Sequence, residues 1–240
     1  MTGLRVSGLS YSYGAKPALK DVGFAIETGA FCALLGPNGA GKSTLYSLLT
    51  RLFVAQTGSI EIAGEDLSAA PRAALARLGV VFQQSTLDLD LTVRQNLAYF
   101  AALQGLSGKA AGRRIDAVLD RLSIADRAQE KARLLNGGHR RRTEIARALI
   151  HEPRVLLLDE PTVGLDAAAR AAITDHAHSL TEEGVTVLWA THLTDEVQGD
   201  DRLVVLHKAR VLADGFARNV AGSVGLRDAF LAMTSEEAAA

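Results

Sequence analysis

The chain has 240 residues, of which 48% are hydrophobic and 22% charged, and its net charge is −1. These values are typical of a globular α/β protein with one large domain or two smaller ones. The charge balance gives no reason to expect nucleic acid as a partner, and no apolar run approaches the roughly 18 residues that cross a bilayer. The N-terminus lacks a signal-peptide pattern, and a single cysteine, Cys32, excludes an internal disulfide. We therefore expect a cytoplasmic protein.

The N-terminal part predicts two strands and a helix. Residues 22–26 alternate apolar and small or polar side chains, which indicates a half-buried strand. After a turn at Thr28-Gly29, Phe31–Leu35 is a short apolar strand that leads directly into a glycine-rich loop. A helix is expected to follow over about residues 45–53. The strand, loop and helix together form the context that a phosphate-binding loop requires.

The loop itself has the pattern G-x-x-x-x-G-K-[ST] of a P-loop. Its glycines let backbone N–H groups point inward at phosphate oxygens, and the next helix adds its positive N-terminal end. Lys42 is expected to reach the β- and γ-phosphates, and the Ser43 hydroxyl to bind Mg²⁺. The residues predicted to bind the nucleotide here are Gly36, Pro37, Asn38, Gly39, Ala40, Gly41, Lys42, Ser43 and Thr44.

The middle of the chain predicts an insertion of helices into an α/β core. Residues 58–64 indicate a strand, residues 72–78 a helix, and residues 79–82 a strand that ends at Gln83-Gln84. From residue 91 to residue 150 the apolar spacing is helical, with a break expected over residues 105–112. No strand pattern occurs in this block.

Near the end of this block, Asn136 precedes two glycines and an arginine run, Arg140 to Arg142. Asn136 is a favourable N-cap, and Gly137 and Gly138 leave the first helical turn open to an anion. The arginines are interpreted as a solvated helix face.

A second chemical feature lies at residues 155–160, Val-Leu-Leu-Leu-Asp-Glu. Such an apolar run is typical of a strand buried on both faces of a parallel sheet, and the carboxyl end of that strand is where α/β proteins bind ligands. Taken alone, two acids there are more often the end of a strand than a site. With the P-loop present, Asp159 gains the role of holding Mg²⁺, and Glu160 that of accepting a proton from the attacking water.

The remaining elements are predicted in order from residue 164 onward. Asp166 follows a turn and caps a helix over residues 167–181, and a strand over residues 184–190 ends at Thr191-His192. A hairpin over residues 203–206 and 211–213, a helix over residues 226–233 and a small Ser-Glu-Glu-Ala-Ala-Ala tail complete the chain.

These motifs, in this order, resemble the ATP-binding subunit of an ABC transporter over nearly the whole chain. Residues 36–44 and 155–160 match its Walker A and Walker B motifs, and residues 135–139 resemble its signature motif, Leu-Ser-Gly-Gly-Gln. Gln83 falls at the Q-loop glutamine, Asp166 at the D-loop aspartate and His192 at the switch histidine. Tyr13 matches the aromatic residue that stacks on adenine, with Tyr11 as the alternative.

The resemblance implies one ATPase domain over residues 1–240, in which a helical subdomain of about residues 87–150 is inserted in a P-loop NTPase core with a mixed sheet and an N-terminal antiparallel β subdomain. It implies ATP and Mg²⁺ as ligands and a head-to-tail dimer, with a second copy or a related subunit. Asn136, Gly137, Gly138 and Asp166 would then serve the partner's nucleotide. Catalysis is assigned to Lys42, Gln83, Glu160 and His192, and the metal to Ser43, Gln83 and Asp159.

The resemblance also implies an integral membrane permease, contacted by the helical subdomain, and a place on the inner face of the cell membrane. The pattern around residues 91–106 and residues 228–233 is similar to exporters of the ABC-2 branch, and residues 137–142 are similar to ATPases associated with PQQ-linked alcohol oxidation. The chain stops too soon for the C-terminal regulatory domain that importers often carry. Two departures, Asn136 for Ser and His139 for Gln, put the rate of hydrolysis in question.

The sequence leaves two alternative functions. A soluble ABC-type ATPase that acts on nucleic acid or the ribosome is the main alternative, although this chain has neither a second ATPase domain nor a basic excess. A nucleotide-binding module without catalysis is disfavoured by Glu160 and His192.

Overall fold

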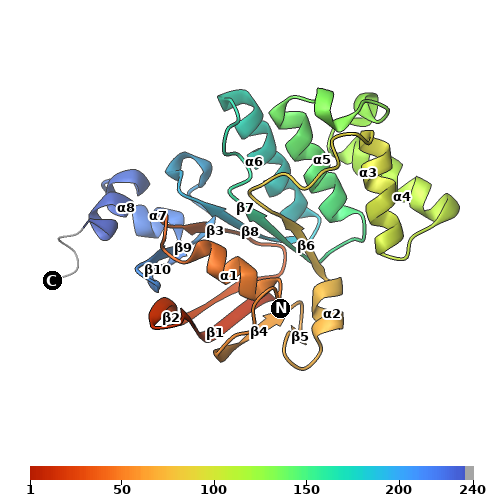
Figure 1. Cartoon of the computed structure of the whole chain (residues 1–240). Coiled ribbons are helices and arrows are strands. Elements are labelled where there is room, and N and C mark those ends of the chain that lie inside the picture. The colour runs from red at the N-terminus through yellow and green to blue at the C-terminus, as the bar shows by residue number, and fades with distance from the viewer. Residues whose placement is uncertain (236–240) are drawn as a thin grey trace.

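The structure, a computed structural model, describes residues 1–235, so residues 236–240 of the predicted tail lie outside the described part. Two sheets form the molecule, a small antiparallel one and a large mixed one, and helix α1 (Lys42–Leu49) lies between them (Figure 1). The buried side chains of α1, among them Leu45 and Leu49, share one apolar core with strands of both sheets. This confirms the predicted fold class.

The small sheet is built from four strands in the order β2-β1-β4-β5: β1 (Thr2–Tyr13), β2 (Lys16–Glu27), β4 (Thr57–Ile62) and β5 (Glu65–Asp66). In β2 the predicted alternation is confirmed, since Val22, Phe24 and Ile26 are buried. The strand is longer than predicted. Its neighbour β1 matches none of the individually predicted strands, because register shifts along its pairing with β2 interrupt the alternation.

The large sheet has the order β10-β9-β3-β8-β7-β6 and is parallel from β9 to β6. Its strands are β3 (Phe31–Leu35), β6 (Leu78–Val81), β7 (Val155–Asp159), β8 (Thr186–Thr191), β9 (Arg202–His207) and β10 (Arg210–Phe216). Every residue of β3, β7 and β8 is buried, which explains why these strands read as unbroken apolar runs. Their carboxyl ends meet at one edge, where the P-loop and the Asp159-Glu160 pair lie.

Three predicted helix boundaries before the helical block are wrong. Helix α1 begins at Lys42 rather than near residue 45, because Gly41 (φ 117°) caps it, and it ends at Leu49 before Arg51, whose φ is 58°. Helix α2 (Pro71–Ala76) ends two residues earlier than expected, since Leu78 pairs with Val155 as the first residue of β6.

Between the neighbouring strands β6 and β7 the chain forms a block of helices, at the upper right of Figure 1. It contains α3 (Val93–Leu103), α4 (Gly108–Arg121), two short 3₁₀ segments, Ala125–Arg127 and Ala132–Leu134, and α5 (Gly137–Leu149). The break between α3 and α4 is shorter than predicted, because α4 begins at Gly108. Among the described residues of this block the only β pairing is an isolated bridge between Thr92 and Lys131.

Helix α6 (Ala167–Glu182) precedes β8, and the 3₁₀ segment Thr194–Glu196 follows it. Helices α7 (Ala217–Ala221) and α8 (Leu226–Thr234) complete the described chain; α7 was not predicted. The hairpin turn between β9 and β10 has left-handed backbone at Lys208 (φ 44°) and Ala209 (φ 68°), the conformation for which glycine is usual. Within residues 1–235 no helix is both long and apolar enough to cross a membrane.

Candidate nucleotide site

The P-loop joins β3 to α1 and depends on glycine at two positions. Gly41 has φ 117°, and a Cβ there would lie 2.6 Å from the carbonyl oxygen of Ala18. A Cβ on Gly36 would lie 2.4 Å from the carbonyl oxygen of Leu206. Larger residues at these positions would push the loop away from β2 and β9, so the loop conformation that presents its N–H groups requires glycine.

The loop borders a cavity of about 290 Å³ at the carboxyl edge of the large sheet. From the P-loop it is lined by Pro37, Asn38, Gly39, Gly41, Lys42, Ser43 and Thr44, and from other segments by Tyr13, Lys16, Pro17, Ala18, Gln83 and Glu160. Of the predicted P-loop contacts, Gly36 and Ala40 do not line it: the carbonyl of Gly36 accepts a hydrogen bond from Lys42, and Ala40 is buried.

The four side chains predicted for catalysis meet at the carboxylate of Glu160. Lys42 Nζ and His192 Nδ1 each lie 3.4 Å from Glu160 Oε1, and Gln83 Nε2 donates to Glu160 Oε2 at 3.1 Å. Lys42 also donates to the carbonyls of Gly36 (2.5 Å) and Pro37 (3.4 Å). These residues come from α1, the segment after β6, the end of β7 and the end of β8, so the sheet brings together residues up to 150 positions apart (42 to 192).

Glu160 has an uncommon backbone conformation for a residue other than glycine, with φ 45°. Its N–H donates to the carbonyl of Ala190 at 2.9 Å, which holds the first residue after β7 against β8. A left-handed glutamate costs about 1 kcal/mol or more and persists only where surrounding contacts fix it. The conformation turns the side chain out of the sheet toward the cavity that it lines.

Asp159, the last residue of β7, is buried, and its pKa is raised from 3.8 to about 6. Burial is the main cause, and the neighbouring Glu160 charge adds to it, while Lys42 and Arg141 act in the opposite direction. Two adjacent buried carboxylates are a favourable place for a cation. No group of three or more His, Cys, Asp or Glu side chains in residues 1–235 could hold a metal alone. Asp159 does not line the cavity itself, whereas its neighbour Glu160 does. Mg²⁺ usually takes only one or two carboxylates and completes its shell with water and phosphate, so carboxylates at this edge of the sheet are compatible with the ion.

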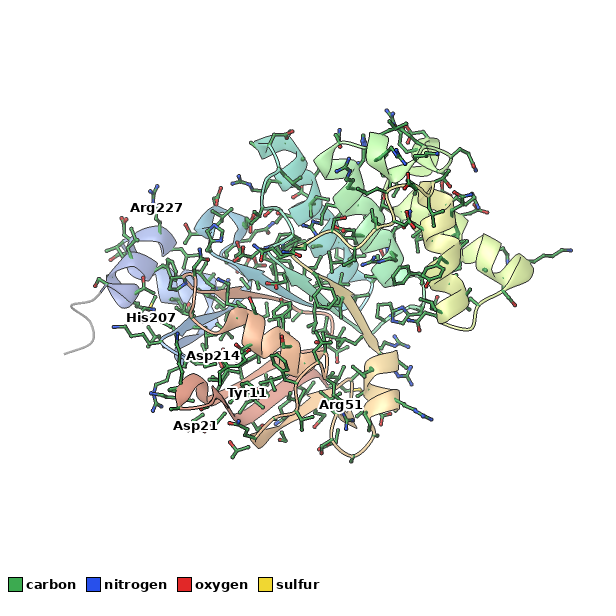
Figure 2. All side chains as sticks on the ribbon, in the orientation of Figure 1. Tyr11, Asp21, Arg51, His207, Asp214 and Arg227 are labelled. Carbon is green, nitrogen blue, oxygen red and sulfur yellow. The ribbon has the colours of Figure 1, made fainter. Side chains whose placement is uncertain are left out.

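Of the two tyrosines considered for adenine, Tyr13 lines the cavity and Tyr11 does not. The Tyr13 hydroxyl lies 3.4 Å from Thr44 Oγ1, and its side chain is half exposed. Tyr11 lies on the N-terminal sheet (Figure 2), where its ring stacks on Phe53 with centroids 5.5 Å apart. Tyr13 therefore has the geometry for a stacking platform.

The signature and D-loop residues are not brought to this cavity. Asn136 caps α5, accepting the His139 N–H at 2.8 Å, and Asp166 caps α6, accepting the Ala169 N–H at 2.8 Å, as predicted. A Cβ on Gly137 would lie 2.9 Å from Leu165 Cδ2, and one on Gly138 would lie 3.2 Å from the Ala169 Cβ, so α5 begins close to the start of α6. Within one chain these residues do not contact the P-loop.

The interpretation of the arginine run as a solvated face is wrong. Arg141 is buried and donates to the carbonyls of Phe82 (2.8 Å) and Gln83 (3.1 Å), while Arg140 donates to the carbonyls of Ala132 (3.0 Å) and Arg133 (2.7 Å). Charged side chains are usually exposed, and nothing in the sequence indicates that backbone carbonyls distant in the chain accept hydrogen bonds from these arginines.

A second group that sequence reasoning missed is Glu196, which is almost completely buried. Its carboxylate accepts hydrogen bonds from Trp189 Nε1 (3.0 Å), Thr191 Oγ1 (2.6 Å) and the hydroxyl of Thr162. It therefore joins the residue before His192 to the segment that follows Glu160. Its position four residues after His192 was the only signal that could have pointed to it.

The chain has a P-loop between β3 and α1, and the buried strand β7 of the same sheet ends in Asp159 and is followed by Glu160. This arrangement defines a P-loop protein that binds a nucleoside triphosphate. The comparisons with known proteins narrow this class. The family model described as "ABC transporter" matches residues 19–163. The chain is 40% identical to the daunorubicin resistance ATP-binding protein DrrA3 of Streptomyces coeruleorubidus over 225 residues, 93% of this chain and 71% of that protein.

It is also 40% identical over 204 residues to the Nod factor export ATP-binding protein I of Burkholderia orbicola (strain AU 1054), covering 85% of this chain and 67% of that protein. Among solved structures it is similar to cbiO1 from Clostridium perfringens, part of the ABC transporter complex cbiONQ, with a TM-score of 0.83, 30% identity and coverage of 91% and 90%. The chain belongs to the ABC transporter family, as one of its ATP-binding subunits. Such subunits are ATPases that work as dimers with membrane permeases.

Proposed function

We propose that this chain hydrolyses ATP at the Glu160 site to power a separate membrane permease, and that the transport is export. The observation that carries the ATPase part is the meeting of Lys42, Gln83 and His192 at the Glu160 carboxylate, beside the P-loop cavity. The export part is supported by the relatives, since one is named for drug resistance and another for Nod factor export.

The reaction is in-line attack of water on the γ-phosphate, and the residues divide the work by charge. Glu160 accepts the proton of the attacking water, which its position at the cavity wall allows. Lys42 and His192 stabilise negative charge on the γ-phosphate, an electrostatic role. Gln83, hydrogen-bonded to Glu160, orients the carboxylate. Tyr13 stacks on the adenine, and the P-loop N–H groups hold the phosphates.

The donors that would hold Mg²⁺ are Ser43, Asp159 and Gln83. Ser43 lines the cavity, and Gln83 uses its amide nitrogen toward Glu160, which leaves its amide oxygen for the ion. Bound Mg²⁺ would neutralise charge on the β- and γ-phosphates.

The nucleotide is completed by a second copy of the chain or a related subunit. Asn136, Gly137, Gly138 and Asp166 lie at the N-terminal ends of α5 and α6, which attract anions, but they are not at the P-loop cavity of their own chain. In a head-to-tail dimer they face the partner's γ-phosphate. The catalytic unit is therefore the dimer.

The permease is contacted by the helical subdomain, taken as residues 87–150 of a single ATPase domain. Helix α3 supports this assignment, because Tyr99 and Leu103 lie one turn apart and are 59% and 62% exposed. Exposed apolar side chains on one helix face favour docking of another protein.

The substitution Glu160→Gln tests the proposal. The amide keeps the shape of the side chain but cannot accept the proton, so hydrolysis is expected to fall roughly 10²–10⁴-fold while ATP binding persists. Turnover is measured by phosphate release, and binding with a fluorescent ATP analogue. Glu183→Gln is a matched control, since Glu183 is exposed, pairs with Arg121 and does not line the cavity. Near-normal turnover in Glu160→Gln would remove Glu160 from this role.

The transport part is tested separately, by basal ATPase activity with and without the membrane protein encoded beside this chain. Stimulation by that protein in membranes is expected. Stimulation by RNA or ribosomes in its place would favour the soluble alternative.

A further inference from the structure

Three charged side chains on one face of α5 hold the backbone of residues 82–86, the segment that follows β6. Arg141 donates to the carbonyls of Phe82 (2.8 Å) and Gln83 (3.1 Å). Glu144 accepts the N–H of Thr86 at 3.1 Å, and Arg147 donates to the carbonyl of Thr86 at 3.0 Å. We call these three side chains the α5 clamp.

The clamp is buried and internally paired. Arg141, Glu144 and Arg147 are 8%, 2% and 5% exposed, and Arg141 donates to Glu144 at 2.7 Å. The Arg147 guanidinium lies over the ring of Phe100 on α3, 4.3 Å from its centroid. Because a buried charge is costly without its partners, the segment cannot leave α5 without exposing or stranding these groups. Helix and segment are therefore expected to move as one body.

Each end of this body reaches a different nucleotide site. The held segment carries Gln83, whose side chain contacts Glu160 in the chain's own P-loop site. The N-terminus of α5 carries Asn136–Gly138, assigned above to the nucleotide on the partner's P-loop. Arg141 lies four residues after Gly137, which is about 6 Å along the helix axis. A short rigid path thus joins the two sites through one chain.

We propose that Arg141, Glu144 and Arg147 are positioning residues that make Gln83 follow the N-terminus of α5, so that the partner's nucleotide controls the Gln83–Glu160 contact in this chain's own site. This inference rests on the proposed head-to-tail dimer. The guanidinium group of Arg141 donates to two successive carbonyls, those of Phe82 and Gln83, and so fixes the orientation of the backbone at Gln83. A lysine ammonium would not fix this orientation in the same way.

A mutant cycle tests the coupling. Turnover is measured for Asn136→Ala, Gln83→Ala and the double variant, first in the native protein and then in a background of Arg141→Met. If the clamp couples the residues, the loss in the double variant differs from the product of the single losses by at least about threefold in the native background. In the Arg141→Met background, the loss of turnover in the double variant is expected to equal the product of the two single losses. Multiplying losses in the native protein, or the same deviation in both backgrounds, would overturn the proposal.

Matched variants separate positioning from simple loss of stability. Arg142→Met makes the same chemical change one residue further on, where the side chain has no hydrogen bond to residues 82–86, and it should keep the native coupling. Arg141→Lys retains a charge and serves if Arg141→Met does not fold, as judged by thermal unfolding; it should also reduce the coupling. Loss of coupling in Arg142→Met as well would count against the clamp.

The proposed ATPase function is decided independently, by the turnover of the native protein and of Glu160→Gln. A protein that hydrolyses ATP through Glu160 but shows no coupling between Asn136 and Gln83 refutes only the clamp.

Discussion

Replacing Asp159 by Asn is expected to stabilise the folded subunit while it removes Mg²⁺-dependent hydrolysis. The carboxyl of Asp159 has a pKa of about 6 in the fold against an ordinary value of 3.8, mainly because it is buried. A difference of about two pKa units is at most about 3 kcal/mol at pH 7.5, and about 2 kcal/mol is expected, since solvent near the cavity screens the charge. If Asp159 holds Mg²⁺ as proposed, this cost accompanies the ionised form that binds the ion.

The sign of the pH dependence follows from the raised pKa. Between about pH 4 and pH 6 the folded state holds a proton that the unfolded chain has lost, so stability contributed by this group falls as the pH rises. The free energy of unfolding is measured by urea titration without nucleotide and with a chelator, for native protein and Asp159→Asn. The variant should be more stable by about 2 kcal/mol at pH 7.5, and this advantage should fall by about half at pH 5. A variant that is less stable at pH 7.5, or whose advantage does not depend on pH, would refute the reasoning.

Three further outcomes are expected. Glu196→Gln places an amide N–H₂ opposite hydrogen-bond donors, so the free energy of unfolding in urea should fall by about 1–3 kcal/mol, and turnover should fall too. Asp195→Asn is the control: Asp195 is exposed, and this change should alter the free energy of unfolding by less than about 0.5 kcal/mol. Tyr13→Ala should raise KM for ATP about 10-fold or more through loss of stacking, whereas Tyr11→Ala should change it less than threefold; the reverse order in steady-state kinetics would make Tyr11 the platform. Lys208→Gly should stabilise the hairpin by about 0.5 kcal/mol in thermal unfolding, because an exposed left-handed residue (φ 44°) loses its strain; a loss of stability would contradict this.

The features predicted correctly from the sequence are those whose cause lies in consecutive residues. The P-loop could be recognised in the sequence because Gly41 and Lys42 are neighbours in the chain and the loop needs both at a fixed spacing. The strands β3 and β7 were found because burial on both faces leaves an unbroken apolar run. Asn136 and Asp166 were recognised as caps because the N–H group that each cap accepts lies three residues ahead.

The missed features depend on partners that are distant in the chain. Arg141 is buried because carbonyls 58 and 59 residues earlier need donors, and Glu196 because a hydroxyl 34 residues earlier does. The residues next to Arg141 and Glu196 in the sequence give no indication that these two side chains are buried. Strand β1 was not predicted for another reason. A register shift lies between Val6 and Leu9, which are both buried although they are three residues apart, so the apolar positions do not follow strict alternation.

In the proposed mechanism, Lys42 connects ATP binding to the contacts of the Glu160 carboxylate. Its ammonium contacts the carbonyl oxygens of Gly36 and Pro37 and, at 3.4 Å, the carboxylate of Glu160. A phosphate oxygen bears more charge than a carbonyl and makes a stronger hydrogen bond with an ammonium group, so ATP that engages the P-loop draws Lys42 from these partners. Glu160 then loses the lysine contact at Oε1 but keeps His192 at the same oxygen and Gln83 at Oε2. If Gln83 in turn follows α5, a nucleotide on the partner also changes how Gln83 holds the carboxylate, and hydrolysis at one site then depends on the other site of the dimer.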